Sequence, residues 1–271
     1  MRRSVILACL AAAGVTILAE ASQPPPLRVY LRGGPKTHGP ATNGLHDGPT
    51  FVKEWVPLLA SRGAKVDGSL TFPSPAQLEQ TDVIVMFAAY AGDITGDSRI
   101  ALEAFLKRGG GIVALHDAVL SRDPQWFKTI IGGAWEDRVA KYFEGESTHY
   151  YLNAAHPIAK DAATFTLTDE VYWDLHLMPN IQVLSAVMQP VRAARGAPPP
   201  PPSNKLIPQM WVFENQLPGG QPYRAVVNLL GHHFTTFSAA PARAIVLRAI
   251  AWAGKRDVDS LATPDEIAAV R

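Results

Sequence analysis

The chain has 271 residues, and its 25 basic and 24 acidic side chains almost balance. This balance excludes a strongly basic surface of the kind that binds nucleic acid or an anionic membrane. The only cysteine is Cys9, so the rest of the chain offers no disulfide, no thiolate nucleophile and no thiolate metal ligand.

The first 21 residues have the three parts of a secretory signal peptide. Two arginines give a positive start, an apolar run covers residues 5–18, and small residues precede position 22. The apolar run is short for a membrane span, and Cys9 lies too early to be a lipoprotein anchor. We therefore expect a periplasmic or secreted protein with a signal peptide at 1–21, a short linker at 22–26 and no stable membrane insertion.

Apolar runs alternate with amphipathic segments through the first half of the chain. Helix patterns cover 51–59 and 97–106, and strand patterns cover 27–31, 64–70, 82–87 and 112–115. The runs at 82–87 and 112–115 are apolar throughout, as expected for strands covered on both faces. This alternation predicts an α/β fold that is broadly flavodoxin-like, with a mostly parallel central sheet and helices on both faces.

The pattern changes after residue 117. We expect helices at 123–131 and 245–253 and strands at 149–153, 163–167, 181–188, 206–213 and 223–229. The proline-rich stretch 189–203 can neither pair into a sheet nor form a helix, so it is predicted to be an exposed loop. We expect one domain over 27–256, followed by a C-terminal tail at 257–271.

Polar residues follow several of the predicted parallel strands. They are His38, His46 and Asp47 after the first strand, Tyr90 and Asp93 after the third, His116 and Asp117 after the fourth, and His232 and His233 after the last. Ligands of open parallel sheets bind beyond the carboxyl ends of the strands, so we expect these segments to meet at one site.

Three of these histidines suit a metal. His46, His116 and His232, together with Asp47 or Glu170, would make a nitrogen–oxygen site for zinc or a similar divalent ion. No compact metal motif such as H-E-x-x-H supports this site, so the hypothesis depends on the predicted convergence of the loops. A divalent metal is the only candidate cofactor.

His116 ends a strand abruptly after three glycines, at a position that resembles the elbow where related α/β enzymes hold a nucleophile. A histidine there suits a general acid, a general base or a metal ligand, because its pKa lies near neutrality. The alternative is structural: His116 would bond to the backbone and Asp117 would cap the next turn.

The stretch 169–176 places carboxylates, aromatic rings and a histidine within eight residues. Carboxylate oxygens bind sugar hydroxyls, aromatic faces cover sugar C–H surfaces, and a carboxyl such as Glu170 can transfer a proton. The alternative is an acidic turn followed by an edge strand, with Trp173 in the core. His156 before a proline is interpreted as structural, and His149 has no assigned role.

Five short motifs, in this order and spacing, resemble the ThuA-like (trehalose utilisation) family. They lie at 109–117, 131–135, 156–158, 169–172 and 230–232. The fold of that family is similar to the class I glutamine amidotransferase domain. Amidotransferases use a cysteine where this chain has His116, so glutamine hydrolysis is excluded. Serine-elbow, dinucleotide-binding and phosphate-loop motifs are absent as well.

The resemblance implies a role in carbohydrate metabolism, in which sugars are oxidised to 3-keto forms and processed further. It implies that His116, Glu170, Tyr172 and His232 belong to the site. We assign catalytic roles to His116, Glu170 and His232. The candidates for substrate binding are Asp117, Tyr172, Trp173, Trp135 and His46.

The leading hypothesis is an enzyme that processes a keto-sugar or 3-keto-glycoside by acid–base chemistry, through hydrolysis, elimination or isomerisation. The alternatives are a sugar-binding protein without catalytic activity and a metal-dependent hydrolase. The expected partner is a small sugar or glycoside and no nucleic acid. A second copy of the chain and a sugar-oxidising enzyme are the candidate protein partners.

Overall fold

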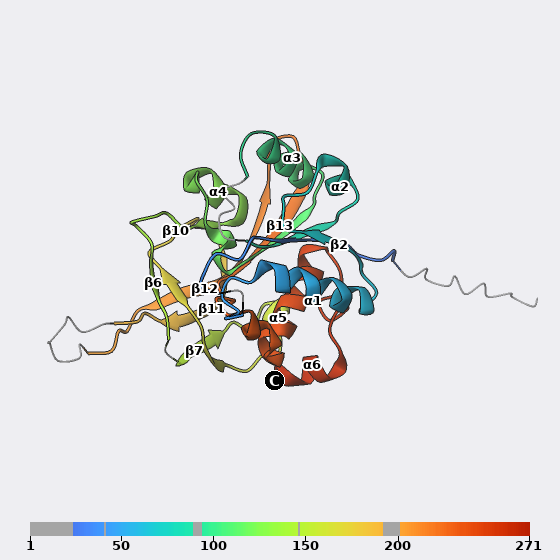
Figure 1. Ribbon diagram of the computed structural model, residues 1–271. Coiled ribbons are helices and arrows are strands. Elements are labelled where there is room, and N and C mark those ends of the chain that lie inside the picture. The colour runs from blue at the N-terminus through green and yellow to red at the C-terminus, as the bar shows by residue number, and fades with distance from the viewer. Residues whose placement is uncertain (1–23, 41, 89–93, 146, 192–200) are drawn as a thin grey trace, which may run out of the picture.

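The computed structural model describes residues 24–40, 42–88, 94–145, 147–191 and 201–271 (Figure 1). The expected signal peptide, the central part of the proline-rich loop, and Tyr90 and Asp93 lie outside the described residues. None of the helices within these ranges combines the length and the apolar character that crossing a bilayer requires.

A nine-stranded sheet in the order β2-β1-β3-β4-β13-β12-β11-β7-β8 organises the chain. Its first five strands are parallel: β2 (Lys65–Ser69), β1 (Arg28–Gly33), β3 (Val83–Phe87), β4 (Gly111–Leu115) and β13 (Pro222–Asn228). Strands β3 and β4 are buried along their whole length, which explains their continuous apolar sequences. The predicted α/β fold with a mostly parallel central sheet is confirmed.

The other four strands extend the sheet in antiparallel fashion. They are β12 (Leu206–Gln216), β11 (Gln182–Met188), β7 (Ser147–Leu152) and β8 (Phe165–Thr168). Two small antiparallel pairs lie apart from this sheet: β5 (Gly133–Ala134) with β10 (His176–Leu177), and β6 (Lys141–Phe143) with β9 (Val171–Trp173). The second pair places Tyr142 opposite Tyr172.

Helices cover both faces of the sheet (Figure 1). One layer contains α1 (Gly48–Ser61), α5 (Ala240–Ala253) and α6 (Pro264–Ala269), and the other contains α2 (Pro75–Glu79), α3 (Gly96–Lys107) and α4 (Pro124–Ile131). Helix α1 buries Phe51, Trp55 and Leu59 from one stripe, and each such side chain contributes roughly 1.5–3 kcal/mol. Single turns of 3-10 helix occur at His116–Val119, Pro157–Ala159 and Phe234–Ser238.

The structure differs from the sequence prediction at three helices. Helix α3 begins at Gly96, with Thr95 at the N-cap position, one residue before the start of the predicted helix pattern at 97. Helices α2 and α6 were not predicted, although each begins with a reciprocal capping box. Helix α6 packs against α5, so the segment 257–271, predicted as a tail, is part of the folded body.

Candidate functional site

The candidate site lies at the carboxyl ends of the parallel strands, where four separate segments each supply one buried polar side chain. His46 precedes helix α1, and His116 directly follows β4. Glu170 lies between β8 and β9, and His232 follows β13. The predicted convergence is therefore present for the loops that carry His46, His116 and His232, which brings together residues up to 186 positions apart, and the Glu170 segment joins them.

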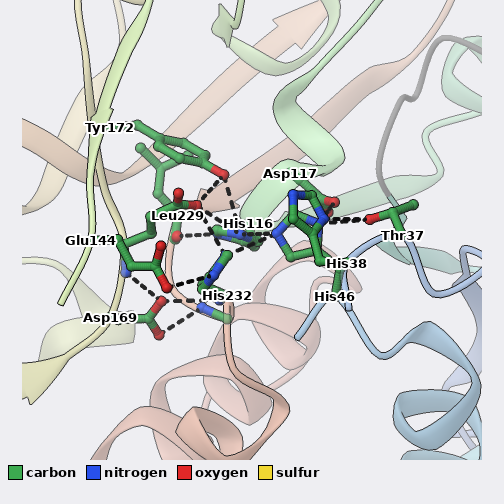
Figure 2. A network of polar contacts seen from close by, with 12 residues as sticks. Thr37, His38, His46, His116, Asp117, Glu144, Asp169, Tyr172, Leu229 and His232 are labelled. Carbon is green, nitrogen blue, oxygen red and sulfur yellow. Dashed lines mark hydrogen bonds and ion pairs between the residues drawn. The ribbon is translucent and has the colours of Figure 1, made fainter. Parts of the chain in front are cut away.

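Four potential ligand atoms lie within 4.8 Å of one another at the centre of the site, and they come from His46, His116, Glu170 and His232. Figure 2 labels the three histidines of this group. Nε2 of His46 lies 3.1 Å from Nε2 of His116 and 2.9 Å from Nδ1 of His232. Oε2 of Glu170 lies 3.1 Å from the same nitrogen of His232 and 3.4 Å from Nε2 of His116. The three imidazole rings thus point one nitrogen each toward a shared centre beside a carboxylate.

An oxygen atom lies near the outer nitrogen of each ring (Figure 2). Nδ1 of His116 donates to the carbonyl oxygen of Leu229 at 3.0 Å. Nδ1 of His46 lies 2.9 Å from Oδ2 of Asp117, and Nε2 of His232 lies 3.2 Å from Oε1 of Glu144. The carbonyl of Leu229 holds the ring proton of His116 on Nδ1, so that the lone pair of Nε2 points at the centre. Nδ1 of His46 has Thr37 Oγ1 as its hydrogen-bond partner at 3.0 Å, and the contacts of Asp117 and Glu144 with the other two rings are ion-pair distances without hydrogen-bond geometry.

These distances fit a divalent metal ion. Ligand atoms lie roughly 3.4 Å apart around a tetrahedral ion with bonds of about 2.1 Å, and about 3.0 Å apart around an octahedral one. The four distances between the inner atoms, 2.9–3.4 Å, span this range. Three imidazole nitrogens and one carboxylate oxygen form a donor set that suits zinc, iron, manganese or cobalt. Of the two carboxylates considered from the sequence, Glu170 faces the centre, whereas Asp47 caps helix α1 by accepting from the amide of Thr50.

Burial and charge act differently on the ionisable groups of the cluster. Burial lowers the pKa of His116, which favours the neutral imidazole that a metal requires. Burial alone would also lower the pKa of His232, but the hydrogen bond to Glu170 raises it above its usual value. Burial opposes ionisation of Glu170, yet its contacts with His232 and His116 hold the pKa of this carboxyl below its usual value.

The hydroxyl of Tyr172 bridges two members of the cluster. It donates to Oε2 of Glu170 at 2.9 Å and lies 3.2 Å from Nε2 of His116. Burial raises the pKa of this phenol well above its usual value, and the charge of Glu170 raises it further. Tyr172 is therefore a neutral hydrogen-bond donor at the centre of the site.

Special backbone conformations position three of the histidines. His46 and His116 adopt left-handed φ values of 42° and 51°, a region in which histidine is more common than most side chains. Gly231, before His232, has φ 126°, and a Cβ atom at this position would lie 2.5 Å from the ring of Phe237. Only glycine fits there, so this close contact fixes the start of the segment that carries His232.

The buried carboxylate of Asp169 joins two of the contributing segments. It accepts hydrogen bonds from the amides of Gly231 and His232, both at 3.0 Å, and from the hydroxyl of Thr236 at 2.6 Å. Because Asp169 precedes Glu170, these bonds tie the segment that carries Glu170 to the segment that carries His232. The relative position of these two side chains is thereby fixed.

A pocket of about 510 Å³ opens onto the cluster, a size typical of small-molecule sites. Most of the residues predicted for the site line it: His46, Asp117, Trp135, Glu170, Tyr172 and His232. His116 lies beneath it, fully buried. Trp173 does not line this pocket: it follows Tyr172 in a strand, points to the other face and lines a separate hollow beside β12.

Sequence reasoning missed several residues of the pocket. Thr37, Asp137, Tyr142 and Glu144 all line it. Three of them lie in the 136–145 region, whose one strand has only three residues and gives no usable periodicity. Of the other histidines, His38 lies against His46 with the rings tilted by 52° and their centroids 4.1 Å apart, whereas His149 and His156 lie outside the pocket lining.

Comparison with known proteins shows which family and which solved structures this chain resembles. The sequence profile of the ThuA family, described as trehalose utilisation, matches residues 40–253. No functionally curated protein matches the chain. A putative ThuA-like protein from Bacteroides uniformis superposes with a TM-score of 0.62 at 16% identity, covering 89% of this chain and 98% of the other. A second such protein, from Parabacteroides merdae, gives a TM-score of 0.58 at 16% identity, with coverages of 84% and 90%.

The family match extends over most of the chain and includes the segments that carry His46, His116, Glu170 and His232. The two solved structures share its fold over nearly their full length. The chain therefore belongs to the ThuA (trehalose utilisation) family.

Proposed function

We propose that this protein is a metal-dependent enzyme of carbohydrate metabolism that performs acid–base chemistry on a keto-sugar or 3-keto-glycoside. The observation that carries the proposal is the cluster itself: three imidazoles, each with an oxygen at its outer nitrogen, face the carboxylate of Glu170 at the end of a pocket of sugar size. The family description, trehalose utilisation, supports carbohydrate metabolism as the context.

His46, His116, His232 and Glu170 would hold the ion. A divalent ion supplies positive charge that polarises a carbonyl oxygen and so acidifies the adjacent C–H bond. In a 3-keto-glycoside, loss of the proton from C2 allows the glycosidic oxygen at C1 to leave. Elimination or isomerisation of this kind needs a base and a proton donor but no strong nucleophile.

Two side chains of the pocket suit these proton transfers. The neutral phenol of Tyr172 lies beside Glu170 and can donate to an oxygen that gains negative charge. Asp117 is buried at the pocket wall, and Oδ2 of its carboxylate lies 2.9 Å from Nδ1 of His46. We assign Tyr172 as the proton donor, and Asp117, whose carboxylate also lies beside His46, as the base that takes the proton from C2.

The signal-like N-terminal sequence supports a periplasmic or secreted location, where the substrate would be an extracellular glycoside that a separate enzyme has oxidised. Localisation can be followed with the full-length chain, by comparing the cell fractions that contain it with those that contain a version lacking residues 1–21.

The deciding experiment follows a 3-keto-disaccharide and its unoxidised parent by NMR in the presence of purified protein, with and without a chelator. We expect turnover of the keto form alone, loss of turnover with the chelator, and recovery when a divalent ion is added back. Tight binding of either sugar without turnover would favour a sugar-binding protein. Turnover that survives complete metal removal would contradict the metal-dependent mechanism.

A further inference from the structure

The wall of the pocket is a series of aromatic rings that runs outward from the histidine cluster. The ring of Tyr172 stacks on His116 at 5.1 Å, and the ring of Trp135 lies edge-on to Tyr172 at 4.9 Å. Tyr142 follows at 6.4 Å from Trp135. Exposure rises along this series, because Tyr172 is 5% exposed, Trp135 is half-buried and Tyr142 is 58% exposed.

The outer part of this wall has the features of a surface for a ring-shaped polar ligand. The indole N–H of Trp135 already donates to Asp137 at 3.0 Å, which fixes the ring without using a group of the ligand. Tyr142 lies opposite Tyr172 across the β6–β9 pair, so both side chains point to the same face. An exposed tyrosine that continues a buried aromatic series provides apolar area and a hydroxyl beyond the reacting centre.

The spacing of the rings matches a ligand with two linked rings. A first sugar ring at the cluster would lie near Tyr172, and a second ring, one glycosidic bond away, would lie over Trp135 and Tyr142. The pocket volume of about 510 Å³ exceeds what a single sugar ring fills.

The charge of the pocket restricts the ligand further. Its lining includes four carboxylates, Asp117, Asp137, Glu144 and Glu170, and no lysine or arginine among the residues that the structure describes. Even with a divalent ion bound, this lining is negative, so a phosphate on the ligand would be repelled. Carboxylates instead accept hydrogen bonds from neutral hydroxyl groups.

We propose that Trp135 and Tyr142, flanked by Asp137 and Glu144, form the subsite that binds the second, unphosphorylated ring of the substrate. This inference rests on the proposed function and deepens it, because it names the residues that select the part of the substrate beyond the reacting ring. It assigns Tyr142 as a residue that determines specificity without touching the reacting atoms.

The test compares the binding of three non-reacting ligands to the metal-loaded protein by calorimetry: an unoxidised disaccharide, the methyl glycoside of one of its rings, and the disaccharide with a phosphate on the second ring. We expect the disaccharide to bind most tightly. In Tyr142→Ala, its affinity should fall by roughly 3- to 10-fold, with no change for the methyl glycoside. Tyr151→Ala removes another exposed tyrosine, from outside the pocket, and should change neither affinity.

Equal affinities for the disaccharide and the methyl glycoside would overturn the inference, and so would an equal loss for both in Tyr142→Ala. Tighter binding of the phosphorylated ligand would also overturn it. The proposed function has a separate readout: selective disaccharide binding without turnover of any keto form would contradict the chemistry and leave the second-ring site supported. Absence of binding for all three ligands would overturn the site itself.

Discussion

Metal binding should stabilise this fold strongly, because the four candidate ligands come from segments that are close only in the folded chain. The sequence separation between the ligands is 70 residues for His46 and His116, and 186 residues for His46 and His232. The unfolded chain therefore holds no preformed site, and the binding free energy adds to the folding free energy.

The size of the effect follows from linkage. At a free metal concentration about 100-fold above Kd, a ligand that binds only the folded state adds about 2.7 kcal/mol. For a domain of this size, each kcal/mol raises Tm by about 2–4 °C, so we expect a rise of roughly 5–11 °C. The rise should follow the logarithm of metal concentration once the site is saturated.

The assay is a thermal melt of the metal-stripped protein titrated with zinc, manganese, cobalt or iron(II). His116→Asn removes the ligand while keeping a residue that tolerates the left-handed backbone, and it should abolish the rise. Glu144→Gln removes the negative charge beside Nε2 of His232, and the affinity of this variant for metal should fall by about 10-fold or more. His149→Ala, a histidine outside the cluster, should retain the full rise.

The reasoning would be refuted if none of these ions raised the Tm of the wild-type protein. A rise of equal size in His116→Asn would likewise show that the ion binds elsewhere.

Three further predictions follow from the site and the fold. Tyr172→Phe should lower turnover by about 10²-fold while metal content, measured by mass spectrometry, stays the same, because only a proton donor is removed; an unchanged rate would remove Tyr172 from the mechanism. The raised pKa of His232 means that protons compete with the ion, so metal affinity measured by calorimetry should decrease as the pH falls toward and below 6.5, and a pH-independent affinity would argue against imidazole ligation. Burial opposes ionisation of Glu266, but bonds from Thr263 and Arg243 lower its pKa below 4.5. The contribution of ionised Glu266 to the free energy of unfolding is therefore complete above pH 4.5, and it is lost as the pH falls through the lower pKa of the folded protein. In denaturant melts, Glu266→Gln should be less stable than wild type at pH 7, and the two proteins should become equally stable at acidic pH.

The sequence predicted the parallel strands and the position of the site because both depend on strong local signals. Continuous apolar runs identify β3 and β4, and a strand that ends at His116 places that residue at the functional edge. Glu170 was identifiable only through the family motif, since an acidic turn explains its local sequence equally well.

Other parts of the site depend on tertiary contacts that leave little trace in the sequence. Tyr142 reaches the pocket because a three-residue strand pairs with β9, and such a short strand has no detectable period. Trp173 was expected at the site, but the alternation of side chains along β9 allows only Tyr172 to face it. The sequence around Asp169 could not show that its carboxylate joins two loops, because the residues of the second loop lie more than 60 positions away.

The left-handed backbone at His46 and His116 limits which substitutions the candidate metal site can accept in evolution. Besides glycine, that conformation accommodates mainly asparagine, aspartate and histidine. Of these four residues, only histidine and aspartate are common metal ligands, so a change that preserves both the backbone and metal ligation leads from histidine to aspartate. Each such exchange replaces a nitrogen by a harder oxygen and shifts the preference from zinc toward manganese or magnesium. The φ angles of His46 and His116 thus restrict which metals related proteins with this backbone could bind.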